Sequence, residues 1–135
     1  MADALYDKGR EGFATAEIDW VDDTIKAVLV DTGAYTASMS SDQFLSDIPS
    51  GARIAISPAF TSKTATAGVC DAADITFATV SGVSVEVLVI FKDTGTASTS
   101  RLIAKIDSAT GLPVTPNGGD INIVWSDGAN KIFKL

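Results

Sequence analysis

Seven short runs of strand-forming residues occupy most of this chain, and they constrain its fold more than any other feature. Each run is rich in valine, isoleucine, phenylalanine or threonine, and each is bounded by glycine, proline, serine or aspartate. Seven short strands in a chain of 135 residues predict a mainly β protein, a compact antiparallel β-sandwich or barrel. The predicted strands lie at residues 24–31, 52–57, 74–80, 83–91, 101–107, 120–126 and 131–134.

The strand pattern also predicts one hairpin and one buried strand. Ser81 and Gly82 separate the runs at 74–80 and 83–91, and they offer a two-residue turn in which glycine accepts a positive φ. The far half of the second run, residues 87–91, is apolar at every position. A strand that is apolar on both faces is expected at the centre of a sheet or beneath a partner.

An amphipathic helix is expected near the amino terminus. Leu5, Tyr6 and Phe13 recur at helical spacing, with charged residues on the opposite side, which predicts a helix over residues 5–13. Two glycines within it lower its intrinsic stability, so it needs a surface on which to pack. We therefore expect residues 1–15 to form a segment that can detach from the core.

A second short helix is predicted over residues 40–48. Ser40 stands three residues before Gln43, which is the spacing of a capping box. Pro49 follows and would end the helix there.

The length and the residue inventory favour one domain, residues 1–135, without a cofactor. A chain of this size buries enough surface to fold without a metal or a disulfide. Cys70 is the single cysteine and is interpreted as a small buried residue, since the chain contains no histidine to serve as its base. The lack of histidine also argues against most zinc sites and serine triads. We expect no catalytic, cofactor or metal residues.

The charge balance argues against nucleic acid and membrane partners. The chain has 17 acidic and 10 basic residues, a formal net charge of −7, whereas binding to polyphosphate needs clustered lysine and arginine. Its longest unbroken apolar run, residues 87–91, is too short to span a bilayer. Its first residues also lack the pattern of a signal peptide, so we expect a soluble protein.

Two Asp-Thr-Gly triplets, at residues 31–33 and 93–95, raise the possibility of an aspartic protease. Such an enzyme brings two aspartates to about 3 Å, so that one shares its proton with the other. Lys92 precedes Asp93, where these enzymes keep an apolar residue. We therefore interpret both triplets as turns and expect no enzyme, because aspartate caps such turns and glycine allows a positive φ. An aspartic-protease-like enzyme that uses Asp31 is kept as an alternative.

Two further patterns have ordinary structural explanations. The acidic stretch at residues 17–23 lacks the alternating ligands and central glycine of an EF-hand loop, so it is interpreted as a solvated acidic face. Trp20 and Trp125 could stack on a sugar or a base, but in a small β domain they are expected in the core or an interface.

Three stretches resemble a group of small structural proteins encoded among the virion genes of tailed bacteriophages. They read ALYDKGREGF, IDWVDDTIKAVLVDTGAYT and GLPVTPNGGDINIVWSDGANKIFKL, and together they cover roughly half of the chain. Members that decorate the head are called cement or decoration proteins, and they clamp neighbouring capsomers from the outside. The resemblance implies the same role here, at the capsid surface of a virion, after synthesis in the host cytoplasm. A tail, tail-tube or head-to-tail connector subunit is the alternative.

The implied partners are the major capsid protein or other virion subunits, and further copies of the chain as a homo-oligomer. Interfaces favour aromatic and uncharged residues, so the helix face and two nearly uncharged loops, residues 58–68 and 92–100, are the candidate contacts. The candidate contact residues are Leu5, Tyr6, Phe13, Phe60, Thr64, Thr94 and Thr96.

Overall fold

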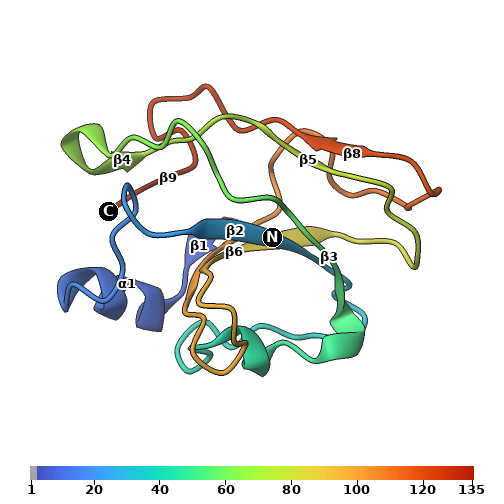
Figure 1. Ribbon diagram of the computed structural model, residues 1–135, viewed down its shortest axis with the longest axis horizontal. Coiled ribbons are helices and arrows are strands. Elements are labelled where there is room, and N and C mark those ends of the chain that lie inside the picture. Colours follow the sequence, from blue (N-terminus) through green and yellow to red (C-terminus); the bar gives the residue numbers. More distant parts are fainter. Residues whose placement is uncertain (1–2) are drawn as a thin grey trace.

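The computed structural model describes residues 3–135, and it is built mainly from antiparallel β-strands (Figure 1). The strands are β1 (Ala4–Leu5), β2 (Ile25–Val30), β3 (Arg53–Ile56), β4 (Val69–Cys70), β5 (Ile75–Phe77), β6 (Val87–Lys92), β7 (Leu102–Ile106), β8 (Ile121–Ile123) and β9 (Phe133–Lys134). The helices are α1 (Asp7–Ala14) and the short 3-10 helices η1 (Leu45–Asp47), η2 (Ser50–Ala52) and η3 (Thr66–Gly68). The mainly β, antiparallel fold predicted from the sequence is confirmed. None of these helices is long and apolar enough to cross a membrane.

A five-stranded sheet forms the centre of the molecule, in the order β1-β7-β6-β2-β3. Strand β6 lies between β7 and β2, where its residues 87–91 are all buried. This confirms that the strand that is apolar on both faces occupies the centre of a sheet.

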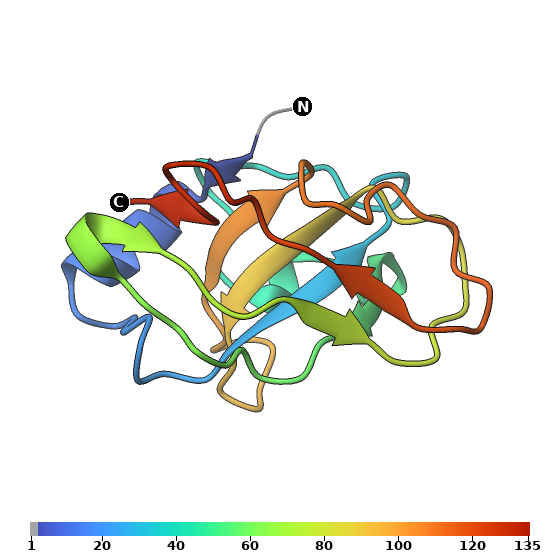
Figure 2. The ribbon, with the colours of Figure 1, turned by 90° about the horizontal axis from the view of Figure 1, so that it is seen from above.

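Two hydrophobic cores lie on the two faces of this central sheet. Above it in Figure 1 are the two-stranded ribbons β4-β9 and β5-β8, and Figure 2 shows them lying across the sheet. Below it lie the segments at residues 32–52 and 93–100. The upper core contains Trp20, Phe60 and Trp125, so both tryptophans occupy core positions.

The amino-terminal segment is part of the domain. Strand β1 pairs with β7, and Tyr6 is completely buried on the lower face. Helix α1, predicted from the sequence, packs so closely on β7 that a Cβ on Gly9 would lie 2.7 Å from the carbonyl oxygen of Ile103. These contacts argue against the expected detachable segment at residues 1–15.

The predicted hairpin across Ser81 and Gly82 is wrong. Strand β5 pairs with β8 in the upper layer, whereas β6 pairs with β2 and β7 in the central sheet. Both edges of β6 are therefore occupied, so β5 cannot lie beside it. The chain between the two strands crosses from one layer to the other, and Val85 forms a bridge with Val114 on the way.

The predicted helix at residues 40–48 is also wrong, because only η1 forms there. The side chain of Asp47 accepts a hydrogen bond from the backbone N–H of Gln43 at 2.8 Å. The backbone N–H of Leu45 donates to the carbonyl oxygen of Ser100 at 2.8 Å. These backbone N–H groups are therefore hydrogen-bonded to a side chain and to a neighbouring loop, and not to carbonyl groups within a helix.

Cys70 is completely buried, as interpreted from the sequence. Burial raises the pKa of its thiol to about 11. The thiolate is therefore scarce near neutral pH, which makes Cys70 a packing residue.

Candidate functional site

Both Asp-Thr-Gly triplets form the same kind of turn. The Asp31 Oδ1 atom accepts a hydrogen bond from the backbone N–H of Gly33 at 2.8 Å. The Asp93 Oδ1 atom accepts one from the backbone N–H of Gly95 at 2.9 Å. In each triplet the aspartate caps a turn at the end of a strand, as the sequence predicts.

The two turns lie at opposite ends of one antiparallel strand pair. Strands β2 and β6 pair Val30 with Val87 at one end and Ile25 with Lys92 at the other. Asp31 follows β2, and Asp93 follows β6. At about 3.4 Å per residue, the paired length separates the two aspartates by roughly 17 Å or more. They therefore cannot share a proton within one chain, and a dyad would need Asp31 from two chains.

Asp93 and its neighbour Lys92 hold the carboxyl end of β6 in place. The Asp93 carboxylate lies 2.8 Å from the Lys26 ammonium, and both side chains are partly exposed. The hydrogen bond from Lys26 lowers the pKa of Asp93 below its usual value. Lys92 lies 3.1 Å from the Asp23 carboxylate and also donates to the carbonyl oxygen of Glu17 at 2.7 Å.

The acidic stretch at residues 17–23 is a hydrogen-bonded turn. The Asp19 Oδ1 atom accepts from the backbone N–H groups of Val21 and Asp22, each at 3.1 Å. In the described part of the chain, no group of three or more acidic or cysteine side chains is placed to hold a metal ion.

The predicted contact residues divide into buried and exposed ones. Leu5, Tyr6 and Phe60 are buried in the domain and offer little surface to a partner. Phe13 is half-buried. The exposed members are the three threonines, Thr64, Thr94 and Thr96.

The two loops predicted as contacts lie in different layers. Residues 58–68 run through the upper layer toward β4, and residues 92–100 project from the lower one (Figure 1). Within the second loop, the Thr94 hydroxyl donates to the carbonyl oxygen of Thr96 at 3.1 Å, and the Ser100 hydroxyl does so at 2.9 Å. The second loop is therefore held by its own hydrogen bonds.

Phe13 lies at an apolar surface that the sequence only partly reveals. Phe13, Val21, Ala65 and Leu135 line one shallow hollow of about 320 Å³, and Phe13 and Leu135 also line an adjoining hollow of about 400 Å³. Val21 and Leu135 are 48% and 54% exposed, which is unusual for large apolar side chains. We call these four residues the Phe13 surface. It joins α1, the following loop, the loop at residues 58–68 and the carboxyl-terminal residue.

Sequence reasoning found Phe13 and the loop around Ala65 but missed the other two members. Val21 stands among acidic residues, where no apolar periodicity marks it, and Leu135 follows the last strand. Only the fold brings these segments together. Val21 directly follows Trp20, and nothing in the local sequence distinguishes the exposed valine from the buried tryptophan beside it.

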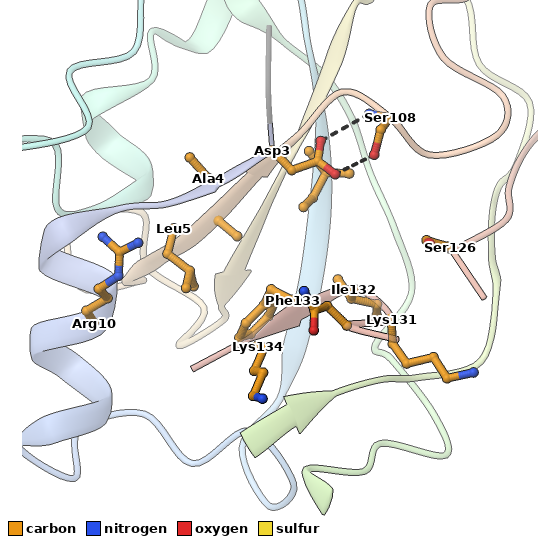
Figure 3. A pocket seen from close by; sticks show the side chains of 13 residues that line it. Asp3, Ala4, Leu5, Arg10, Ser108, Ser126, Lys131, Ile132, Phe133 and Lys134 are labelled. Atoms are coloured by element: carbon orange, nitrogen blue, oxygen red, sulfur yellow. Dashed lines mark hydrogen bonds between the residues drawn. The ribbon is translucent and has the colours of Figure 1, made fainter. Parts of the chain in front are cut away.

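A third hollow, of about 360 Å³, lies between β1 and β9, and we call it the β1–β9 pocket (Figure 3). Asp3 and Leu5 line one side, and Phe133 and Lys134 line the other. The Asp3 carboxylate accepts hydrogen bonds from the Ser108 hydroxyl and the Ser108 backbone N–H. Burial opposes ionisation of Asp3, but hydrogen bonds from Ser108 and the neighbouring backbone outweigh it and lower its pKa.

No family model matches this chain, and no curated protein matches it. Its function is therefore inferred from its own residues.

Proposed function

We propose that this protein is a bacteriophage capsid decoration, or cement, protein that binds the outside of the assembled head and stabilises it. The observation that carries this proposal is the Phe13 surface, which gathers apolar side chains from four separate segments. The resemblance of three sequence stretches to small virion proteins of tailed bacteriophages supports the same role. The partners are the major capsid protein and further copies of this chain.

The Phe13 surface has the properties expected of a docking site. Interface cores favour aromatic and apolar residues and exclude charge. The Phe13 ring is held by the Phe133 ring, with 6.1 Å between their centroids, so it is already ordered before a partner arrives. Such preorganisation reduces the entropy lost on binding.

A repeating lattice makes modest contacts at this surface sufficient. A decoration protein presents many copies to many equivalent sites, so contacts through more than one subunit raise the effective concentration of each remaining contact. The apolar character of the Phe13 surface implies that attachment is mainly non-electrostatic. The net charge of −7 would then lie mostly on the outward surface and discourage particles from sticking together.

Single substitutions test whether the Phe13 surface attaches the protein. Val21→Asp places a charge in the surface, and Val83→Asp is its matched control, since Val83 is 54% exposed and lies outside both hollows. We expect particles to retain the wild-type and Val83→Asp proteins and to lose the Val21→Asp protein. Equal retention of both variants would contradict the role of the Phe13 surface.

A salt series and immunolabelling test the rest of the proposal. At about 0.5 M salt the screening length falls to about 4 Å, so an attachment driven by charge should release the protein, whereas an apolar one should hold. Steady release with rising salt would instead favour pairing of the acidic stretch with a basic patch.

Labelling of intact particles should mark the heads. Label on the tails would replace this proposal with a tail, tail-tube or connector role.

A further inference from the structure

The β1–β9 pocket lies between two strand edges that have no partner among residues 3–135. Strand β1 is the edge of the central sheet and pairs only with β7. Strand β9 pairs only with β4 in the layer above. Unpaired strand edges are templates for an additional strand.

The hydrogen-bond register shows which backbone groups face away from the existing partners. The backbone N–H of Tyr6 donates to the carbonyl oxygen of Ile103 at 3.0 Å. In an antiparallel pair the next residue points its N–H and C=O outward, and here that residue is Leu5. In the same way, the N–H of Leu135 donates to the carbonyl oxygen of Gly68 at 2.9 Å, so the N–H and C=O of Lys134 face away from β4.

The side chains around the pocket combine an apolar floor with positive charge. Leu5 and Phe133 are among the apolar residues that line it, and Arg10, Lys131 and Lys134 supply three cations. In the described part of the chain, no ion pair involves Lys131 or Lys134, whereas Arg10 also contacts Asp7 at 3.1 Å. Three of the ten basic residues of an acidic protein therefore lie around one pocket.

One acidic residue, Asp3, also lines the pocket and offsets part of this positive charge. The Asp3 carboxylate is occupied by donors from Ser108 and by the backbone N–H of Asp107, which donates at 2.8 Å. Neither lysine forms an ion pair among residues 3–135, and the three cations of the pocket outnumber its one carboxylate. The charge of the two lysines is therefore available to a negatively charged ligand.

We propose that the β1–β9 pocket accepts an extended acidic segment of a partner protein as an additional strand beside β1. The free edge at Leu5 supplies backbone hydrogen bonds, the apolar floor takes alternate side chains, and the two lysines select carboxylates. Main-chain pairing of this kind gives affinity, and the side-chain pockets give specificity. This inference goes beyond the proposed attachment at the Phe13 surface and does not depend on it. The pocket would bind an extended acidic segment from any protein, whether or not that protein is a capsid subunit.

The test uses the purified full-length protein and a blocked hexapeptide of alternating valine and glutamate. Amide chemical shifts are followed by NMR as the peptide is added to about 1 mM, a concentration that detects weak binding. We expect shift changes at residues 3–5 and 131–134. The same peptide with lysine in place of glutamate should leave these shifts unchanged. Changes elsewhere only, or no change, would overturn the proposal.

Two matched comparisons separate charge from backbone pairing. Lys134→Glu should weaken binding by about fivefold or more, while Lys8→Glu, the same charge change at a residue outside the pocket, should have little effect. Two further peptides carry N-methyl groups at either the odd or the even positions. Strand addition requires that one set abolishes binding and the other does not, since only alternate N–H groups face β1. Equal effects of the two sets would exclude strand addition, and equal effects of the two substitutions would exclude charge selection.

Discussion

Gly9 of α1 lies directly against the backbone of Ile103 in β7. A Cβ at residue 9 would fall 2.7 Å from the Ile103 carbonyl oxygen and 2.9 Å from that of Leu102. Real Cβ atoms do not approach backbone oxygens this closely, and a backbone oxygen cannot rotate away as a side chain can. The glycine that weakens the helix is therefore what allows the helix to reach the sheet.

We expect Gly9→Ala to destabilise the protein by about 1–3 kcal/mol, because overpacking outweighs the gain of about 1 kcal/mol in helix propensity. The measurement is the free energy of unfolding from urea titration. Gly51→Ala is the matched control, since nothing lies within 4 Å of a Cβ at that position. A Gly9→Ala protein more stable than the wild type would show that the helix moves freely on the sheet.

Removal of residues 1–15 is expected to prevent stable folding. It deletes β1, the whole of α1 and the completely buried Tyr6 side chain. Loss of a large buried aromatic alone costs about 3–5 kcal/mol, which is a large part of the stability of a small domain. Circular dichroism and urea titration of the truncated chain provide the check. A cooperative transition like that of the full chain would show that the segment is detachable, as its sequence suggests.

Much of the fold could be predicted because the strands carry their own signals. Residues 87–91 are apolar on both faces, and this local property identifies β6 as a central strand. The hairpin failed because Ser81 and Gly82 describe a turn but not the partner of each strand. The pairing depends on which strands occupy the two edges of β6, and here β2 and β7 occupy them. A local sequence pattern does not show which strands these will be.

The candidate surfaces were harder to predict for the same reason. The amphipathic pattern placed Leu5, Tyr6 and Phe13 on one helix face, but the first two precede α1 and enter the domain. Phe13 meets Val21 and Leu135 only after the chain has folded. Lys131 and Lys134 of the β1–β9 pocket come from the turn before β9 and from β9 itself. The strand predicted over residues 131–134 did not reveal that this segment lies opposite β1.

The ion pair between Asp93 and Lys26 is expected to stabilise the protein at neutral pH but not in acid. The pKa of Asp93 in the folded state is lowered, so the contribution is present above the unfolded value of about 3.9 and is lost as pH falls through the folded value. Because the pair is partly exposed, Asp93→Asn should cost no more than about 1 kcal/mol at neutral pH. The cost should shrink toward pH 3. Asp31→Asn is the control and should change the stability little at any pH in this range, since asparagine still accepts the Gly33 hydrogen bond. A stability cost of Asp93→Asn that does not vary with pH would contradict the ion-pair account.

Tyr6, Tyr35 and Asp42 form a chain of hydrogen bonds beneath the central sheet. The two phenol oxygens lie 2.8 Å apart, and the Tyr35 hydroxyl donates to the Asp42 carboxylate at 2.7 Å. Burial raises the pKa of Tyr6 to about 12 and that of Tyr35 further, because a phenolate there would be desolvated and, for Tyr35, would also face the Asp42 carboxylate. Both hydroxyls therefore stay protonated in the folded protein.

Raised folded-state pKa values make this part of the stability vulnerable to alkali. The contribution is complete below the unfolded tyrosine value of about 10 and is lost as pH rises from there through the folded values. These are the two tyrosines in the chain, so tyrosinate absorbance reports on this cluster. We expect the absorbance to rise in one step together with loss of the circular dichroism signal, at a pH above that of free tyrosine. In Tyr6→Phe, which keeps the Tyr35–Asp42 bond, the step should keep its cooperativity with a smaller amplitude. Gradual ionisation near pH 10 in a protein that remains folded would mean that the two hydroxyls are not buried in solution.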